Sequence, residues 1–446
     1  MDGRYKERLG DLPFIFSEKG LNQARLEVEI KYLIRLAKDP LIPELETFSK
    51  EQENFLSCLW KDFSLEQARQ IKKIEKKTNH DVKAVEYFIR EQLFRKGFPQ
   101  KTLEFVHFAL TSEDVNNLAY RLMLKKGLGL YLDLLENVLR KQAELARLHQ
   151  NVPILALTHG QSASPTTVGK EWLYYHQRLN KQKNLLRSFH LYGKCAGATG
   201  NWSAHKMAYP KINWIEWSRL FVESLGLCFS PVNTQIESQD SLIELYQAFI
   251  RVNNILKDLD QDLWMYISRG VFKQKFLEEE VGSSTMPHKV NPIDFENSEG
   301  NAGVANALLD HFCHKLAISR FQRDLSDSTV IRNQGLALGY SYLALHSLLK
   351  GLNKLSVDPI KVQNELKEHW EVLAEPTQIL FKKWGKGHAY EQLKALSRGR
   401  AADQVNWHKQ IRSLGLNAEQ MKELLILSPE YYTGEAAHLV DLYLND

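Results

Sequence analysis

A short polar segment in the second half of the chain combines residue types that can move a proton and hold an anion. It covers residues 282–292, GSSTMPHKVNP, where a glycine free to adopt unusual backbone conformations precedes two serine hydroxyls. Lys289 adds a cation and Asn291 an amide. A polar loop of this kind suits proton transfer at an anionic substrate, and an ordinary surface loop is the alternative.

The same segment leads into an expected helix. Asn291 and Pro292 are the residue types preferred at the N-cap and at the first helical position. Asp294 and Glu296 fall in the first turns, where acidic side chains complement the positive end of the helix dipole. We therefore expect the loop to lie at a helix N-terminus.

A second polar segment, TNHD at residues 78–81, interrupts the helical pattern of the N-terminal region. It precedes an expected helix over residues 82 to about 96, which Asn79 or Asp81 could cap. Capping does not require the histidine between them. His80 is therefore a candidate site residue.

Two more segments place reactive residue types between expected helices. Residues 111–114, TSED, fit a capping box in which Asp114 is the acidic partner of Thr111, and that structural role suffices by itself. His159 lies next to Gly160 in the polar sequence THGQS, where an imidazole is open to proton transfer. A purely structural histidine is the alternative for His159.

Residues 320–333, RFQRDLSDSTVIRN, gather three arginines and several hydroxyls. Guanidinium groups bind phosphates and carboxylates through paired hydrogen bonds, so this cluster suits a phosphate or a dicarboxylate. The alternative is a surface network of Arg–Asp pairs, which would contribute little stability.

The scaffold that must position these residues is predicted to be all-α. Between residues 238 and 269, apolar residues recur in alternating steps of three and four, as in long helices packed at shallow angles. This apolar seam consists of Leu242, Leu245, Phe249, Val252, Leu256, Leu259 and Leu263. The charges beside it are expected to be solvated or to lie at its rim: Lys257, Asp258, Asp260 and Asp262. Few segments alternate with the period of a half-buried strand.

The length of the chain, 446 residues, is too great for one simple core. Prolines and composition shifts suggest an N-terminal helical domain at residues 1–98 and a central bundle of long helices at residues 99–351, which carries the polar loop. A C-terminal helical domain is expected at residues 352–446. Neither a dinucleotide-binding GxGxxG pattern nor a P-loop is present.

Composition is that of a soluble globular protein, with 43% apolar and 25% charged residues. The net charge of +4 is mild and argues against a nucleic-acid or membrane partner. No apolar run reaches the roughly 20 residues that span a bilayer, and the N-terminus lacks the apolar core of a signal peptide. The four cysteines are scattered, so we expect reduced thiols, a cytoplasmic protein and no zinc site.

The segment from Ser283 to Pro292 resembles the signature of the fumarase/aspartase superfamily. Residues 79–86, 111–114, 158–161 and 323–332 make the chain similar, more narrowly, to the adenylosuccinate lyase family, and the resemblance covers nearly the whole chain. It implies an all-helical three-domain fold with a central bundle of long helices. It also implies a homotetramer with composite active sites.

The chemistry that the resemblance implies is a β-elimination that cleaves a C–N bond and releases fumarate. The substrates would be two purine nucleotide precursors: adenylosuccinate, which gives AMP, and the succinyl-carboxamide ribotide SAICAR, which gives AICAR. By resemblance, Ser283 takes the Cβ proton and His159 protonates the leaving nitrogen. By residue type alone, Ser284 would serve equally well as the base. His80 would bind substrate beside the acid, and Glu296 would orient and charge it.

The resemblance also implies the groups that bind substrate. Lys289 and Asn291 would hold the succinyl carboxylates and stabilise a carbanion-like intermediate. The implied contacts are Arg4, Tyr5, Asn79, His80, Asp81, Thr111, Ser112, Gln235, Lys289, Asn291, Arg323, Ser328 and Arg332. No metal and no organic cofactor is required. Because related proteins carry a short leader before the segment that matches Arg4 and Tyr5, we expect Met1 to be a late or trimmed start.

Other functions remain alternatives. Fumarase, aspartase and argininosuccinate lyase share the polar loop, but the arginine cluster and residues 79–81 favour a phosphorylated nucleotide. A catalytically retired, structural member of the fold is disfavoured because Ser283, His159 and Lys289 are all present. An unrelated helical scaffold would explain the apolar seam and none of the polar clusters.

Overall fold

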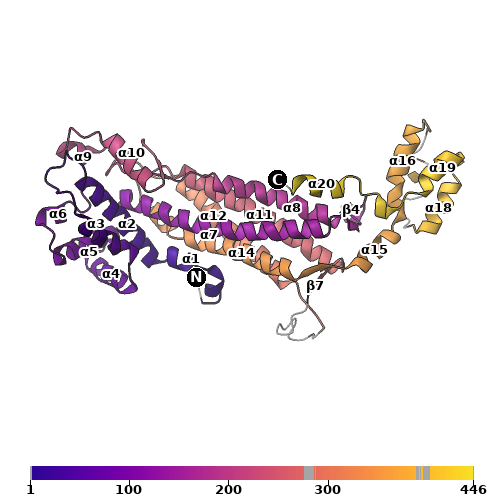
Figure 1. Cartoon of the computed structure of the whole chain (residues 1–446), viewed down its shortest axis with the longest axis horizontal. Coiled ribbons are helices and arrows are strands. Elements are labelled where there is room, and N and C mark those ends of the chain that lie inside the picture. Colours follow the sequence, from indigo (N-terminus) through magenta and orange to yellow (C-terminus); the bar gives the residue numbers. More distant parts are fainter. Residues whose placement is uncertain are drawn as a thin grey trace. The chain divides into compact units, whose positions relative to one another are not determined.

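The computed structural model describes most of the chain, and the regular secondary structure of the described part is mainly helical (Figure 1). The described residues are 3–275, 286, 288–387, 391, 393–394 and 402–444. Their strands are only two or three residues long, so the predicted all-α fold class is confirmed.

The helical elements follow one another along the chain, and some connections between them exceed ten residues. They are η1 (Lys6–Leu9), α1 (Leu12–Ile15), α2 (Glu18–Ala37), α3 (Lys50–Lys61), α4 (Leu65–Thr78), α5 (Asp81–Arg95), α6 (Gln100–Glu104), α7 (Ser112–Leu148), α8 (Val168–Arg187), α9 (Ser203–Ala208), α10 (Trp214–Ser224), α11 (Asp240–Ser268), α12 (Ile293–Leu316), α13 (Ser326–Ile331), α14 (Gln334–Lys354), α15 (Pro359–Lys367), η2 (Trp370–Leu373), α16 (Ala374–Lys383), α18 (Gln404–Arg412), α19 (Ala418–Leu425), η3 (Pro429–Tyr431) and α20 (Ala436–Tyr443).

The strands form two-stranded pairs between helices. They are β1 (Pro153–Ile154), β2 (Leu157–Thr158), β3 (Gln161–Ser162), β4 (Thr166–Thr167), β5 (Tyr192–Gly193), β6 (Cys228–Phe229), β7 (Phe272–Gln274) and β8 (Leu355–Val357). Strand β1 pairs with β4, β2 with β3 and β7 with β8, all antiparallel, whereas β5 and β6 are parallel.

The chain divides into two compact units, and each unit is assembled from three separate segments. Unit 1 contains Met1–Leu134, Gln182–Asn254 and Gly300–Ala344. Unit 2 contains Leu135–Lys181, Ile255–Glu299 and Leu345–Asp446. The division into domains at residues 98 and 351 stays a prediction.

In unit 1, the long helices α7, α11, α12 and α14 pack side by side (Figure 1). The ring of Tyr131 on α7 meets that of Phe249 on α11 edge to face, with the centroids 4.8 Å apart. Ser341 on α14 donates to Asn253 on α11 at 2.6 Å, and Asn253 in turn donates to Asn306 on α12 at 2.9 Å. Buried hydrogen bonds of this kind fix how the helices are aligned along their length.

The apolar seam predicted between residues 238 and 269 is confirmed as the buried stripe of α11, because all seven of its residues are at most 2% exposed. The prediction for one neighbouring charge is wrong. Asp260 is 1% exposed, and its burial raises the pKa of this carboxyl well above the ordinary value. It follows Leu256 by four residues and precedes Leu263 by three, so it lies on the same face of the helix.

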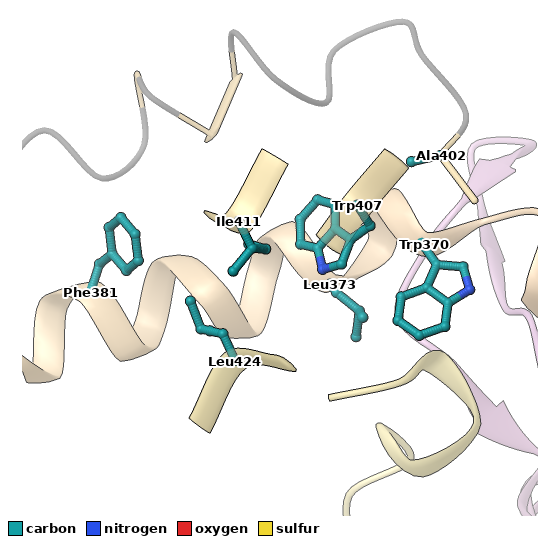
Figure 2. Close-up of a cluster of buried hydrophobic side chains, with 7 residues drawn as sticks. All are labelled: Trp370, Leu373, Phe381, Ala402, Trp407, Ile411 and Leu424. Atoms are coloured by element: carbon teal, nitrogen blue, oxygen red, sulfur yellow. The ribbon is translucent and has the colours of Figure 1, made fainter. Parts of the chain in front are cut away.

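The C-terminal part of unit 2 has its own apolar core, built from short helices. Figure 2 shows this C-terminal core, in which side chains from η2, α16, α18 and α19 gather together with Ala402. Its buried members are Trp370, Leu373, Phe381, Ala402, Trp407, Ile411 and Leu424. Burying two tryptophans and several aliphatic side chains supplies several kcal/mol of hydrophobic stabilisation, at about 1.5–3 kcal/mol for each large side chain.

Candidate active site

The polar loop at residues 282–292 is described only in part. Ser283 and Ser284 lie outside the described residues, so the assignment of the base stays a prediction. Lys289 is exposed, and its backbone N–H donates to the carbonyl of Met286 at 3.0 Å. Asn291 is half-buried immediately before α12.

The helix that follows the loop begins one residue later than expected. Glu296 N–H donates to the carbonyl of Pro292 at 3.2 Å, so Pro292 and not Asn291 takes the N-cap position of α12. Asp294 and Glu296 do fall in the first turn, as predicted. Lys289 and Asn291 precede this helix N-terminus, whose dipole favours an anion.

The start of α12 is held in place by buried contacts within unit 2. Asp294 is buried and forms ion pairs with Lys354 at 2.8 Å and with Lys350 at 3.4 Å. Phe295 packs against Gly351 of α14, where a Cβ atom would lie 2.6 Å from the phenylalanine ring. No sequence pattern predicts that Lys354, 60 residues away, is the partner of Asp294.

His159 lies at the tip of a β-hairpin. It forms the two-residue connection between β2 and β3 together with Gly160, and both residues have positive φ, 54° and 72°. That conformation matches a type I′ turn, in which histidine is uncommon and glycine is favoured. The His159 side chain is exposed, where it can meet a substrate.

The expected pairing of His159 with Glu296 is not formed within this chain. Glu296 is exposed on α12 and accepts a hydrogen bond of 3.3 Å from the indole N–H of Trp264 on α11. Within the described residues, no hydrogen bond or ion pair joins the two side chains. The pairing therefore stays a prediction for an assembly of chains.

In unit 1, His80 is itself the N-cap of α5, a role that the sequence suggested for its neighbours. Its Nδ1 accepts the N–H of Lys83 at 3.1 Å, which leaves the ring proton of the neutral imidazole on Nε2. Nε2 lies 3.5 Å from Ser112 Oγ, and Asn79 takes the left-handed conformation just before His80, at φ 51°. His80 and Ser112, predicted separately, therefore meet.

Asp81 connects two arginines. Its Oδ2 accepts from the buried Arg25 at 2.5 Å and from Arg332 at 2.8 Å, and Arg25 also donates to Asn116 at 2.9 Å. Burial alone would raise the pKa of Asp81, but Arg25, the N–H of Val82 and Arg332 hold it well below the ordinary value. Asp81 thus stays ionised and fixes Arg332. Nothing in the spacing of the sequence pointed to Arg25.

The segment at residues 111–114 begins α7 and contains one confirmed half of the predicted capping box. The N–H of Thr111 donates to Asp114 Oδ2 at 2.9 Å. Asp114 is fully buried and also forms an ion pair with Lys194 at 2.9 Å. It accepts from the N–H groups of Ala196 and Gly197 as well. Asp114 is therefore a structural anchor for Thr111.

Carboxylates of unit 1 form ion pairs with the arginine cluster at residues 320–333. Arg323 pairs with the buried Glu113 at 3.1 Å and with Asp327 at 3.7 Å, and it donates to Gln235 Oε1 at 3.4 Å. Burial raises the pKa of Glu113 to about 7, against the opposing charge of Arg323. Ser328 is half-buried beside Asp327, whose carboxylate accepts its N–H at 2.7 Å.

Arg4 and Tyr5 lie at the start of the described chain, with the Arg4 guanidinium 5.8 Å from the centre of the Tyr5 ring. Just after them, a cavity of about 530 Å³ in unit 1 is lined by residues that include Lys6, Phe16 and Arg332. The cavity is large enough for a small metabolite.

Within the described residues, no group of three or more His, Cys, Asp or Glu side chains is arranged to hold a metal ion. No described helix has both the length and the apolar character of a membrane span.

Known proteins are similar to this chain in both sequence and fold. The family model described as Lyase matches residues 3–306, and the model described as Adenylosuccinate lyase C-terminal matches residues 319–433. The chain is 46% identical over 444 residues to an adenylosuccinate lyase of Legionella pneumophila (strain Corby), covering 99% of this chain and 97% of that one. It is 44% identical over 446 residues to the adenylosuccinate lyase of Escherichia coli (strain K12), with the same coverage.

Solved structures share the fold at low sequence identity. A fumarate lyase from Mesorhizobium sp. BNC1 superposes with a TM-score of 0.79 at 17% identity, covering 98% of this chain and 97% of that chain. A 3-carboxy-cis,cis-muconate lactonizing enzyme from Pseudomonas putida gives 0.77 at 19% identity, covering 100% and 98%. The family model and the relatives, together with the fold, define a lyase of the fumarase/aspartase superfamily. Within that class, the chain belongs to the adenylosuccinate lyase family.

Proposed function

We infer that this chain is a C–N lyase of purine nucleotide biosynthesis that eliminates fumarate from adenylosuccinate, giving AMP, and from SAICAR, giving AICAR. The observation that carries this inference is 44–46% identity along 99% of the chain to proteins named adenylosuccinate lyase. The match to the C-terminal family model, over residues 319–433, adds a part of the chain that the general lyase model does not reach.

The proposed reaction is a β-elimination by a general base and a general acid. Ser283 removes the Cβ proton, the electron pair forms the C=C bond of fumarate, and the C–N bond breaks. The nitrogen that leaves takes a proton from His159. Serine is a weak base, so we expect Lys289, loop amides and exclusion of water to stabilise its alkoxide.

The succinyl carboxylates would bind at the start of α12. Lys289 and Asn291 precede this helix, whose N-terminal N–H groups and dipole attract negative charge. As the Cβ proton leaves, charge builds on the neighbouring carboxylate, and preorganised donors stabilise the intermediate. Asp294 forms an ion pair with Lys354 inside unit 2, so its role is to hold the helix end.

His80, Ser112 and Thr111 would bind the substrate from unit 1. His80 Nε2 carries a proton in the neutral ring and points toward the Ser112 hydroxyl, 3.5 Å away, so this pair can donate to a substrate oxygen. Asn79 belongs to the same surface, because its left-handed backbone ends α4 directly before His80.

The nucleotide would be held by the arginines of unit 1. Arg332 is oriented by Asp81, and Arg323 by Glu113 and Gln235. Both guanidinium groups are thus preorganised to meet a phosphate. The set is completed by the half-buried Ser328 and, near the N-terminus, by Arg4 and Tyr5.

We propose that the working enzyme is a cytoplasmic homotetramer with composite active sites and without a metal or organic cofactor. The proposal rests on the family resemblance and on His159 and Glu296, which do not pair within one chain. A measured solution mass of about four chains would support it. A fully active monomer would contradict it.

The function is tested by incubating the purified protein with adenylosuccinate and, separately, with SAICAR. Ultraviolet absorbance follows turnover, and chromatography identifies the products. We expect AMP with equimolar fumarate from the first substrate, and AICAR with fumarate from the second. If neither purine substrate is turned over, the substrate assignment is wrong and the other fumarate-releasing reactions become the next candidates.

A further inference from the structure

The hairpin that carries His159 is tied at its base to the C-terminal part of unit 2. Ser162, the last residue of β3, has its Oγ 3.1 Å from Nδ1 of His369. The same Nδ1 lies 2.7 Å from Oε1 of Glu371. An ionised carboxylate only accepts hydrogen bonds, so Nδ1 carries a proton, which it directs to Glu371 and shares with Ser162.

The far end of this contact is anchored in a packed core. Glu371 Oε2 accepts the N–H of Ala402 at 2.9 Å, and the N–H of Trp370 donates to the Ala402 carbonyl at 2.7 Å. Trp370 lies between His369 and Glu371 in sequence, and its ring is part of the C-terminal core in Figure 2. The position of His369 is therefore fixed by the core and not by a mobile surface chain.

Two further contacts join residues next to the hairpin to the C-terminal part of unit 2. Leu155, just before the hairpin, packs with Leu366 and Val372 in a small buried cluster. Ser164, just after the hairpin, donates a hydrogen bond to Glu375 of α16. Contacts on both sides of β2 and β3 thus hold the base of the hairpin, while its tip remains exposed.

We propose that His369 is a positioning residue for His159: through Ser162 it fixes the angle at which the hairpin presents the catalytic imidazole. The His159 ring has no hydrogen bond of its own within the described residues, so its placement depends on the hairpin backbone. Misplacing a reacting group by about 1 Å can cost on the order of 100-fold in rate. The proposal rests on the proposed function, because it takes His159 as the acid.

The test uses three variants of the full-length enzyme. His369→Ala removes the contact, whereas His369→Asn keeps a donor close to the position of Nδ1. His408→Ala is the matched control, because the centroid of the His408 ring lies 5.4 Å from that of Trp370, and no hydrogen bond between described residues joins His408 to the hairpin. We expect His369→Ala to lower kcat about 10- to 100-fold with KM nearly unchanged, and we expect both other variants to stay close to wild type.

A readout that does not depend on activity follows the hairpin directly. Amide hydrogen exchange of Ala163, whose N–H donates to the Ala156 carbonyl at 2.9 Å, should become faster in His369→Ala and not in His408→Ala. If exchange at Ala163 is unchanged in His369→Ala, the positioning role is wrong. This conclusion holds whichever substrate the enzyme uses, because the exchange measurement does not depend on turnover. Faster exchange with wild-type kcat overturns the link to catalysis. An equal loss of kcat in His408→Ala would reduce His369 to a general stability residue, which also refutes the proposal.

Discussion

At the scale of residues, unit 1 of this lyase places two arginines by means of carboxylates, the half-buried Asp81 and the buried Glu113. Asp81 is ionised and holds Arg332, whereas Glu113 pairs with Arg323 at a position so buried that its pKa rises to about 7. The two carboxylates therefore respond differently to pH. Asp81 keeps its charge throughout the neutral range, and Glu113 changes its charge within that range.

The titration of Glu113 should be visible in the pH dependence of stability. Because its pKa in the folded state lies above that of an exposed carboxyl, its favourable contribution is complete at low pH and is lost as the pH rises through about 7. In Glu113→Gln the side chain has nearly the shape of the protonated carboxyl and is uncharged at every pH. Relative to this variant, we expect the wild type to lose on the order of 1–3 kcal/mol between about pH 5 and pH 8.

Thermal unfolding of both proteins across this pH range measures the effect. The quantity that matters is the difference between the two unfolding free energies, in which the other titrating groups cancel. A difference that stays constant with pH would show that Glu113 does not titrate in the neutral range. Its charge beside Arg323 would then not change between about pH 5 and pH 8.

At the scale of elements, the segment after Arg4 and Tyr5 is held by an aromatic side chain inserted between two glycines. A Cβ atom on Gly127 of α7 would lie 2.6 Å from the ring of Phe16, and one on Gly335 of α14 would lie 2.3 Å from its Cβ. Phe16 also lines the cavity next to Arg332. Close packing at these glycines therefore orders the N-terminal segment that we expect to contact the nucleotide.

A matched pair of substitutions on α7 tests this packing. Gly127→Ala should destabilise the fold by about 1–3 kcal/mol, because the added methyl group displaces Phe16, and it should raise KM for the nucleotide substrate. Gly129→Ala, two residues along the same helix, meets nothing within 4 Å and should be neutral or slightly stabilising. Denaturant unfolding and steady-state kinetics of both variants decide the matter. Equal effects at the two positions would contradict the role given to Phe16.

The elements that could be predicted from sequence were those with a long periodic signal. The seam of α11 is visible because seven apolar residues repeat over about six turns of helix. The prediction for α5 is correct to within one residue at each end. The hairpin at His159 was not visible, since two-residue strands are too short to show alternation. The prediction that Asp260 is solvated is wrong, because charge alone does not reveal which side of a helix is buried.

At the scale of the whole molecule, residues that were predicted one by one come together through contacts distant in sequence. His80 meets Ser112, Asp81 meets Arg332, and Gln235 meets Arg323. Local patterns cannot reveal these partners, because each contact depends on how helices pack. The resemblance to known lyases selected the residues, and the fold explains how unit 1 positions them.

The most direct test of the central claim, a fumarate-releasing lyase with Ser283 as base, is the rate of fumarate formation from adenylosuccinate by Ser283→Ala beside Ser284→Ala. Both variants should remain folded, and the wild type provides the reference. We predict that Ser283→Ala loses at least roughly 100-fold in kcat, the range of a lost general base, while Ser284→Ala keeps most of its activity. Full activity in Ser283→Ala with loss in Ser284→Ala would contradict the account by placing the base at the neighbouring residue.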